Sequence, residues 1–126
     1  MTDTLRTENS LAEARLQKLL LRFALAAQAH HAAMEALDAE QAEAQARILA
    51  GLHETIASLG EQGFAKLRQL VDSCDPVIAG MAAVYTIRLD SEHCLATLCR
   101  IAKEPGLLGF RAGIAVERWK SGEWNG

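Results

Sequence analysis

The stretch DPVIAGMAAVYTIRL, residues 75–89, decides the fold of this chain. It contains no charged side chain from Pro76 to Ile87, and a helix that is apolar on all sides is stable in water only inside a packed protein. Its β-branched residues would also suit a strand. However, Asp75 can cap a helix, and Pro76 fits the first helical position, where its missing N–H costs nothing. The stretch is too long for a typical buried strand and too short to span a bilayer. It therefore predicts a core helix of a soluble, all-α domain.

Length and composition indicate one cytoplasmic domain. The chain has 126 residues, of which 50% are hydrophobic, enough to fill one core, so we expect a single helical domain over residues 1–126. The formal net charge is −3, which argues against direct nucleic-acid binding, because that binding needs cations to neutralise phosphates. The first ten residues are polar and include acids, unlike a secretory signal. We expect no association with membranes.

Two long amphipathic patterns fill the N-terminal half. Ser10 and Glu13 have the spacing of a capping box, so a helix is expected to begin near Leu11, after a disordered segment at residues 1–9. Apolar residues then recur at steps of three and four up to residue 59, as on helix faces. One helix of that length would be unusual. We therefore predict a turn near residues 38–40, with Gly60 as the left-handed residue that closes the second helix.

Four shorter helices are predicted in the C-terminal half. The first covers GFAKLRQLV (63–71), and the second is the core helix after Pro76. The third follows a cap at Ser91 and ends at the break formed by Pro105 and Gly106. The last covers about residues 107–120, and residues 121–126 form a C-terminal tail. The residues expected inside the first and last of these helices are Phe64, Leu67, Leu70, Val71, Leu108, Phe110, Ile114 and Ala115.

Six helices joined by short turns pair naturally as three antiparallel hairpins stacked side by side. The segment LRQLVDSCDPVIAGMAA (67–83) resembles a HEAT repeat, with a leucine-rich helix, an Asp and Asp-Pro turn, and a second helix that carries an Ala-Ala pair. One difference is Ala79, at a position where such repeats often have Arg. The resemblance implies a HEAT-like right-handed helical repeat.

The sequence contains no recognisable catalytic or metal-binding pattern. His31 and Glu35 are one helical turn apart, but no Glu stands three residues before any of the four histidines, as a di-metal bundle would require. His93 and Cys94 are adjacent, so on a helix they point about 100° apart and do not face each other. The three cysteines lack metal and disulfide spacing and are expected to be reduced and buried. His53 is expected at the surface. We therefore expect no enzymatic activity, no metal and no cofactor.

The charge pattern is more informative about a partner. Between residues 31 and 54 there are five acids and one opposing residue, Arg47, which gives a local net charge of −4. Such a run is most simply a solvated helix face. It can also be an acidic patch that attracts a basic partner and sets specificity. On this second interpretation, the partner-binding residues are Glu35, Asp38, Glu40 and Glu43.

The C-terminal half carries a more specific resemblance. It contains, in order, an Asp-Pro turn, an Ala-rich helix, LCRIA (98–102), GLLGFRA (106–112) and WKSGEW (119–124). This order resembles a bacterial family of small HEAT-like proteins of unknown function, some of which look like immunity proteins encoded beside nuclease effectors of the type VI secretion system. The resemblance implies inhibition by binding: in the cytoplasm, the protein would cover the DNA-binding or catalytic surface of a cognate toxin.

Two other functions are compatible with the same sequence. A helical-repeat scaffold or homo-oligomeric interaction module would have no toxin partner and would associate with itself. A metalloenzyme would purify with bound metal. Trp119 and Trp124 could anchor a partner, since Trp is enriched at binding hot spots, and Trp119 could equally close the core.

Overall fold

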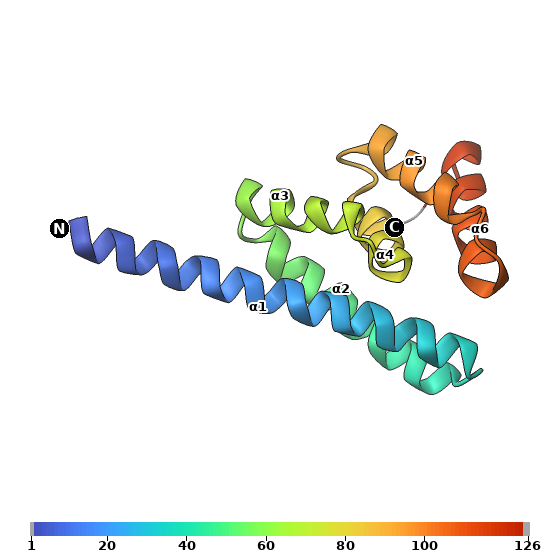
Figure 1. Cartoon of the computed structure of the whole chain (residues 1–126), viewed down its shortest axis with the longest axis horizontal. Helices are drawn as coiled ribbons and strands as arrows, with labels where there is room; N and C mark the ends of the chain where they lie inside the picture. The colour runs from blue at the N-terminus through green and yellow to red at the C-terminus, as the bar shows by residue number, and fades with distance from the viewer. Residues whose placement is uncertain (1, 125–126) are drawn as a thin grey trace.

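The computed structural model describes residues 2–124, with side chains from residue 7 onward, and every element in this range is a helix (Figure 1). The all-helical prediction is therefore confirmed. No helix in the described range is long and apolar enough to cross a membrane. The elements are α1 (Thr2–Glu35), α2 (Ala39–Ala57), α3 (Glu61–Gln69), the 3-10 helix η1 (Leu70–Asp72), α4 (Pro76–Thr86), α5 (Ser91–Ile101) and α6 (Gly106–Ser121).

Helix α4 begins as predicted and lies at the centre of the molecule. The Asp75 carboxylate accepts a hydrogen bond from the Val77 N–H at 2.9 Å, and Pro76 takes the first helical position. The helix contacts α1, α3, α5 and α6, which surround it (Figure 1). Its buried residues are small, which lets the neighbouring helices come close: Ala79, Ala82, Ala83 and Thr86.

Helices α1 and α2 form a long antiparallel hairpin (Figure 1). The turn occupies residues 36–38, close to the predicted position. Leu37 supplies its reversal with a φ of 58°, in a left-handed region that residues other than glycine adopt infrequently. Asp38 then caps α2, because its carboxylate accepts a hydrogen bond from the Gln41 N–H at 3.1 Å. Because Leu37 itself adopts the left-handed conformation, the turn between α1 and α2 contains no glycine.

The N-terminus of α1 differs from the prediction. The helix begins at Thr2, so the predicted start near Leu11 is wrong, and Ser10 and Glu13 lie inside the helix. Residues 2–9, which were expected to be disordered, are helical, and Met1 lies outside the described residues. The segment around Ser10 is rich in Leu, Ala, Glu and Arg, which are good helix formers. Because of this high helix propensity, α1 continues through Ser10 and Glu13, although the two residues have the spacing of a capping box.

Two other helix ends also differ in detail. Gly60 has a positive φ of 75°, as predicted, but its ψ of −147° is not left-handed helical, and the residue precedes α3. Asp90, rather than Ser91, is the cap residue of α5. Asp90 occupies the cap position, but its carboxylate makes no capping hydrogen bond to the helix. Instead, the carboxylate accepts a hydrogen bond from Arg68 Nε at 2.5 Å.

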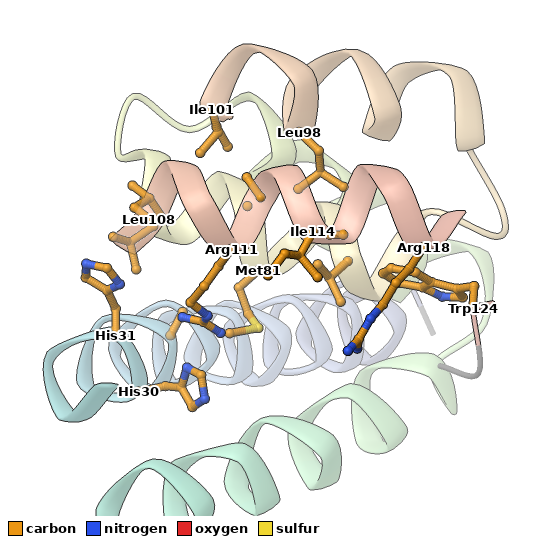
Figure 2. A pocket seen from close by; sticks show the side chains of 16 residues that line it. His30, His31, Met81, Leu98, Ile101, Leu108, Arg111, Ile114, Arg118 and Trp124 are labelled. Atoms are coloured by element: carbon orange, nitrogen blue, oxygen red, sulfur yellow. The ribbon is translucent and has the colours of Figure 1, made fainter. Parts of the chain in front are cut away.

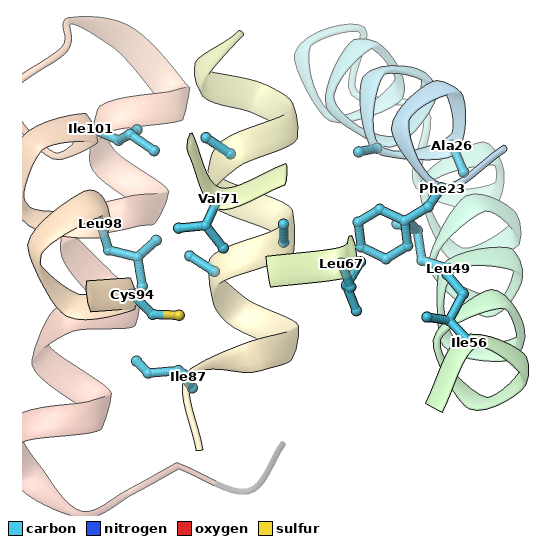
Figure 3. Close-up of a cluster of buried hydrophobic side chains, with 14 of the residues drawn as sticks. Phe23, Ala26, Leu49, Ile56, Leu67, Val71, Ile87, Cys94, Leu98 and Ile101 are labelled. Atoms are coloured by element: carbon cyan, nitrogen blue, oxygen red, sulfur yellow. The ribbon is translucent and has the colours of Figure 1, made fainter. Parts of the chain in front are cut away.

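The hydrophobic core is continuous from the α1–α2 hairpin to α6 (Figure 3). Phe23 lies on one side of α4, packed with side chains from α2 and α3, and Leu98 lies on the other side, packed with side chains from η1 and α5. Both side chains are almost completely buried. Figure 3 labels, on the side of Phe23, the residues Phe23, Ala26, Leu49, Ile56 and Leu67. On the side of Leu98 it labels Val71, Ile87, Cys94, Leu98 and Ile101.

The face that helix α6 turns to the core agrees only in part with the predicted one. Phe110 is 66% exposed, whereas Gly109, Ala112 and Val116 are buried. A Cβ atom at Gly109 would lie 1.8 Å from the Glu104 carbonyl oxygen, so the glycine permits the close approach of the preceding turn. Three of the residues predicted to be buried, Leu108, Ile114 and Ala115, are half-buried, and Leu108 and Ala115 pack against the core.

Candidate functional site

The four predicted partner-binding acids lie at one end of the α1–α2 hairpin, and all four are exposed. Glu35 ends α1, Asp38 lies in the turn, and Glu40 and Glu43 lie in the first turns of α2. The reversal at residues 36–38 therefore brings acids from both helices to the same end. Together with Leu37, which lies between them in the turn, they form a surface that we call the acidic tip.

Two of the acids also have structural contacts. Glu35 Oε1 lies 2.5 Å from His31 Nε2, and Asp38 caps α2. Glu40 and Glu43 make no side-chain hydrogen bond or ion pair within the described range. Their carboxylates are therefore free for a partner, whereas those of Glu35 and Asp38 are held in place.

Leu37 gives the acidic tip an apolar centre that the sequence did not reveal. Its side chain is 91% exposed, and its positive φ costs a residue other than glycine about 1–2 kcal/mol. The exposure buries no apolar area, and a glycine would make the same reversal without the steric cost. Residues held in strained conformations cluster at functional sites. In the sequence, Leu37 continues the apolar pattern of α1 and therefore resembles a core residue.

A groove of opposite charge runs between α1 and α2, away from the turn. It has a volume of about 800 Å³. The exposed apolar residues Leu21 and Ile48 contribute to its wall. Four cations surround it, and within the described range none of them has an ion-pair partner: Arg15, Lys18, Arg22 and Arg47. We call this surface the basic groove.

The adjacent residues His93 and Cys94 have different side-chain partners. Cys94 is buried, as predicted, and its Sγ lies 3.1 Å from Thr86 Oγ1. Burial raises the pKa of the Cys94 thiol, which disfavours the thiolate needed for a nucleophile. The His93 ring contacts Asp72, with 2.8 Å between Nε2 and Oδ1. Cys74 is exposed, so the prediction that all three cysteines are buried is wrong for this residue, and Cys99 is only half-buried.

His53 is also less exposed than predicted. It is half-buried in α2, and its ring lies against the Tyr85 ring of α4, with 4.8 Å between the centroids. Burial lowers the pKa of His53. In the described part of the chain, no three side chains of His, Cys, Asp or Glu are grouped so that they could hold a metal ion.

No family model matches the chain, and no curated protein or solved structure is significantly similar to it. The resemblance to small HEAT-like immunity proteins therefore stays a prediction.

Proposed function

We propose that this protein binds a basic protein partner through the acidic tip and inhibits it, as an immunity protein does for a cognate toxin. The observation that carries the proposal is an exposed, left-handed Leu37 among four exposed acids. The acids attract a cationic surface and set the orientation of the encounter. The leucine adds apolar area that is buried only when the partner binds.

A nuclease toxin, such as a type VI secretion effector, is the partner that suits this chemistry best. A nuclease surface is basic because its substrate is anionic, so an acidic tip competes with the nucleic acid for the same surface. Glu35 and Asp38 need little additional ordering when the partner binds, because His31 and the start of α2 already hold their carboxylates. Such preorganisation reduces the entropy lost on binding.

The finer architecture belongs to the same proposal. Three antiparallel hairpins, α1–α2, α3–α4 and α5–α6, stack as a right-handed HEAT-like repeat and leave the first turn free at one end. Packing between the members of each pair and the Asp-Pro turn before α4 support this arrangement.

The proposal is tested by reversing the two acids that have no structural role. The double variant Glu40→Lys, Glu43→Lys is expected to weaken binding to the protein encoded by the adjacent gene at least tenfold, or about 1.4 kcal/mol. Surface plasmon resonance measures this loss at fixed ionic strength. The matched control, Glu61→Lys with Glu117→Lys, reverses two exposed acids elsewhere and should bind like the wild type. Equal losses in both variants would mean that net charge, not the acidic tip, determines binding.

Leu37 allows a second test that separates binding from folding. Glycine adopts a positive φ without steric cost, and Leu37 buries almost nothing. The variant Leu37→Gly is therefore expected to be more stable to urea than the wild type and to bind the partner more weakly. Full affinity in this variant would remove Leu37 from the binding surface.

Self-association is the second candidate function, and one observation favours it. On the same hairpin, the acidic tip carries four acids and the basic groove carries four cations, and the exposed Leu21 and Ile48 line the groove. Two copies could therefore pair the tip of one with the groove of the other. Sedimentation velocity at low and high salt distinguishes this function, because an association of this kind weakens as salt screens the charges. If the protein is a monomer at all salt concentrations, self-association is excluded and binding of a different protein remains as the proposed function.

A further inference from the structure

A cavity of about 360 Å³ lies between α1, α4 and α6 (Figure 2). This volume falls within the range of about 300–1,000 Å³ that is typical of small-molecule sites. The wall is mostly apolar, with Val77, Met81 and Val84 from α4 and Ile114 from α6. Trp124 lines the end near Arg118 (Figure 2), and its ring packs edge-on against Trp119, with 6.0 Å between the centroids.

Two cations of α6 line this apolar space, Arg118 near Trp124 and Arg111 opposite α1. The Arg111 side chain extends toward α1 beside Met81 (Figure 2) and is half-buried. Burial lowers the pKa of Arg111. Its guanidinium makes no hydrogen bond or ion pair within residues 7–124, and none of the residues that line the cavity is acidic. A partly desolvated charge is costly unless an anion pairs with it, so Arg111 lacks the anion that its position calls for.

Two histidines of α1, His30 and His31, line the cavity on the side toward which Arg111 extends (Figure 2). The Nδ1 atoms of His30 and His31 are buried and have no hydrogen-bond partner in the described structure. His30 is only 9% exposed, whereas His31 is held through its other ring nitrogen by Glu35. Buried polar atoms are normally paired. An anionic acceptor at this place would pair with the Arg111 guanidinium, and with the His30 ring when Nδ1 carries the proton.

We propose that this cavity binds a small amphipathic carboxylate. The carboxylate pairs with the Arg111 guanidinium and accepts a hydrogen bond from the His30 ring, while the apolar body of the ligand lies against Val77, Met81 and Val84. A guanidinium matches the planar carboxylate with two parallel hydrogen bonds. The apolar lining excludes a ligand that is charged throughout. This site is separate from the acidic tip, with which it shares only the contact between His31 and Glu35.

Octanoate is the probe for this site, and isothermal titration calorimetry with the full chain measures its binding. We expect saturable binding of one octanoate per chain. Octanamide has the same apolar body without the charge, and acetate has the charge without the body. Both are expected to bind at least tenfold more weakly than octanoate. Equal binding of octanoate and octanamide, or no saturable binding of octanoate, would overturn the proposal.

The variant Arg111→Met tests the role of the cation, because methionine keeps an apolar stem and removes the charge. It is expected to weaken octanoate binding at least tenfold while the thermal unfolding curve stays in place or moves upward, since an unpaired charge is removed. The matched control Arg100→Met changes an exposed arginine of α5 and should bind octanoate normally. Wild-type affinity in folded Arg111→Met would also overturn the proposal. Neither variant alters the acidic tip, so failure here does not affect binding of the protein partner.

Affinity for octanoate should also depend on pH through His30. Burial, then the charge of Arg111, then His31 lower the pKa of His30 in the free protein. The charged or titratable groups of the cavity are His31 from α1 and Arg111 and Arg118 from α6, and α4 contributes none. A bound carboxylate opposes the effect of Arg111 and favours protonated His30. Octanoate should therefore bind more tightly as the pH falls below about 6.5, and the variant His30→Gln should lose this dependence. A pH dependence unchanged in His30→Gln would contradict the predicted contact.

Discussion

At the scale of single residues, two helical glycines lie in opposite surroundings. Gly51 in α2 is exposed, and an added Cβ would meet nothing within 4 Å, whereas a Cβ at Gly109 would meet the Glu104 carbonyl oxygen at 1.8 Å. The sequence alone does not distinguish them, because both are single glycines inside helical patterns. The difference arises from what packs against each one.

This difference predicts opposite effects of the same substitution. Gly51→Ala should raise the free energy of unfolding by about 1 kcal/mol, because alanine restricts the unfolded chain and favours helix. Gly109→Ala should lower it, because the turn before α6 would have to move. Urea denaturation followed by circular dichroism measures both changes. A stabilised Gly109→Ala would mean that the turn tolerates the displacement.

A second residue-scale prediction concerns pH. His53 has a lowered pKa in the folded state because of burial, partly offset by Glu54. As the pH falls, His53 therefore takes up a proton in the unfolded chain at a higher pH than in the folded chain. This contribution to stability is fully present above the unfolded value of about 6.5 and is lost as the pH falls through the folded pKa. The variant His53→Phe keeps a ring against Tyr85 and should lose less stability than the wild type between pH 7.5 and 5. Equal losses in urea denaturation would show that His53 does not contribute.

At the scale of helices, the start of α4 depends on Asp75. Besides capping the helix, its carboxylate accepts a hydrogen bond from Gln28 Nε2 of α1 at 2.8 Å. The cap was predictable because Asp followed by Pro is a local signal that needs no tertiary information. The link to Gln28 was not predictable, because it joins residues 47 positions apart.

We expect Asp75→Ala to lower the free energy of unfolding by about 1 kcal/mol, within the usual range for the loss of an N-cap. Asp75→Asn keeps a capping oxygen and should cost much less. Both values come from chemical denaturation at neutral pH. A similar loss in the two variants would indicate that the charge, and not the capping oxygen, stabilises α4.

Other properties of the helices could not be predicted from local sequence signals. In α6, apolar residues lie on more than one face, so periodicity did not identify Gly109, Ala112 and Val116 as the buried side. The start of α1 was misplaced because capping-box spacing also occurs inside helices. For the acidic tip, the four acids were predicted from charge, but their meeting point depends on the turn at Leu37.

At the scale of the whole molecule, stability should decrease with distance from α4. This helix is surrounded by α1, α3, α5 and α6, whereas residues 8–15 of α1 are exposed on every side and extend past the rest of the protein (Figure 1). A single helix of that length without packing is marginal in water.

Hydrogen exchange followed by mass spectrometry should therefore show the slowest exchange in α4 and the fastest helical exchange at residues 8–15. Protection at residues 8–15 that increases with protein concentration would instead support self-association. Exchange in α4 as fast as in this segment would contradict its central position in the core.

The sequence by itself determined the helical class, the capped and buried helix at residues 76–86, and the acidic character of residues 35–43. These properties follow from local composition, spacing and capping, which act over a few residues. Only the tertiary structure decided which face of α6 is buried, how Leu37 is exposed, and how Arg111 and His30 meet in one cavity. Those outcomes depend on contacts between segments far apart in the chain, and apolar periodicity does not specify which helices will touch.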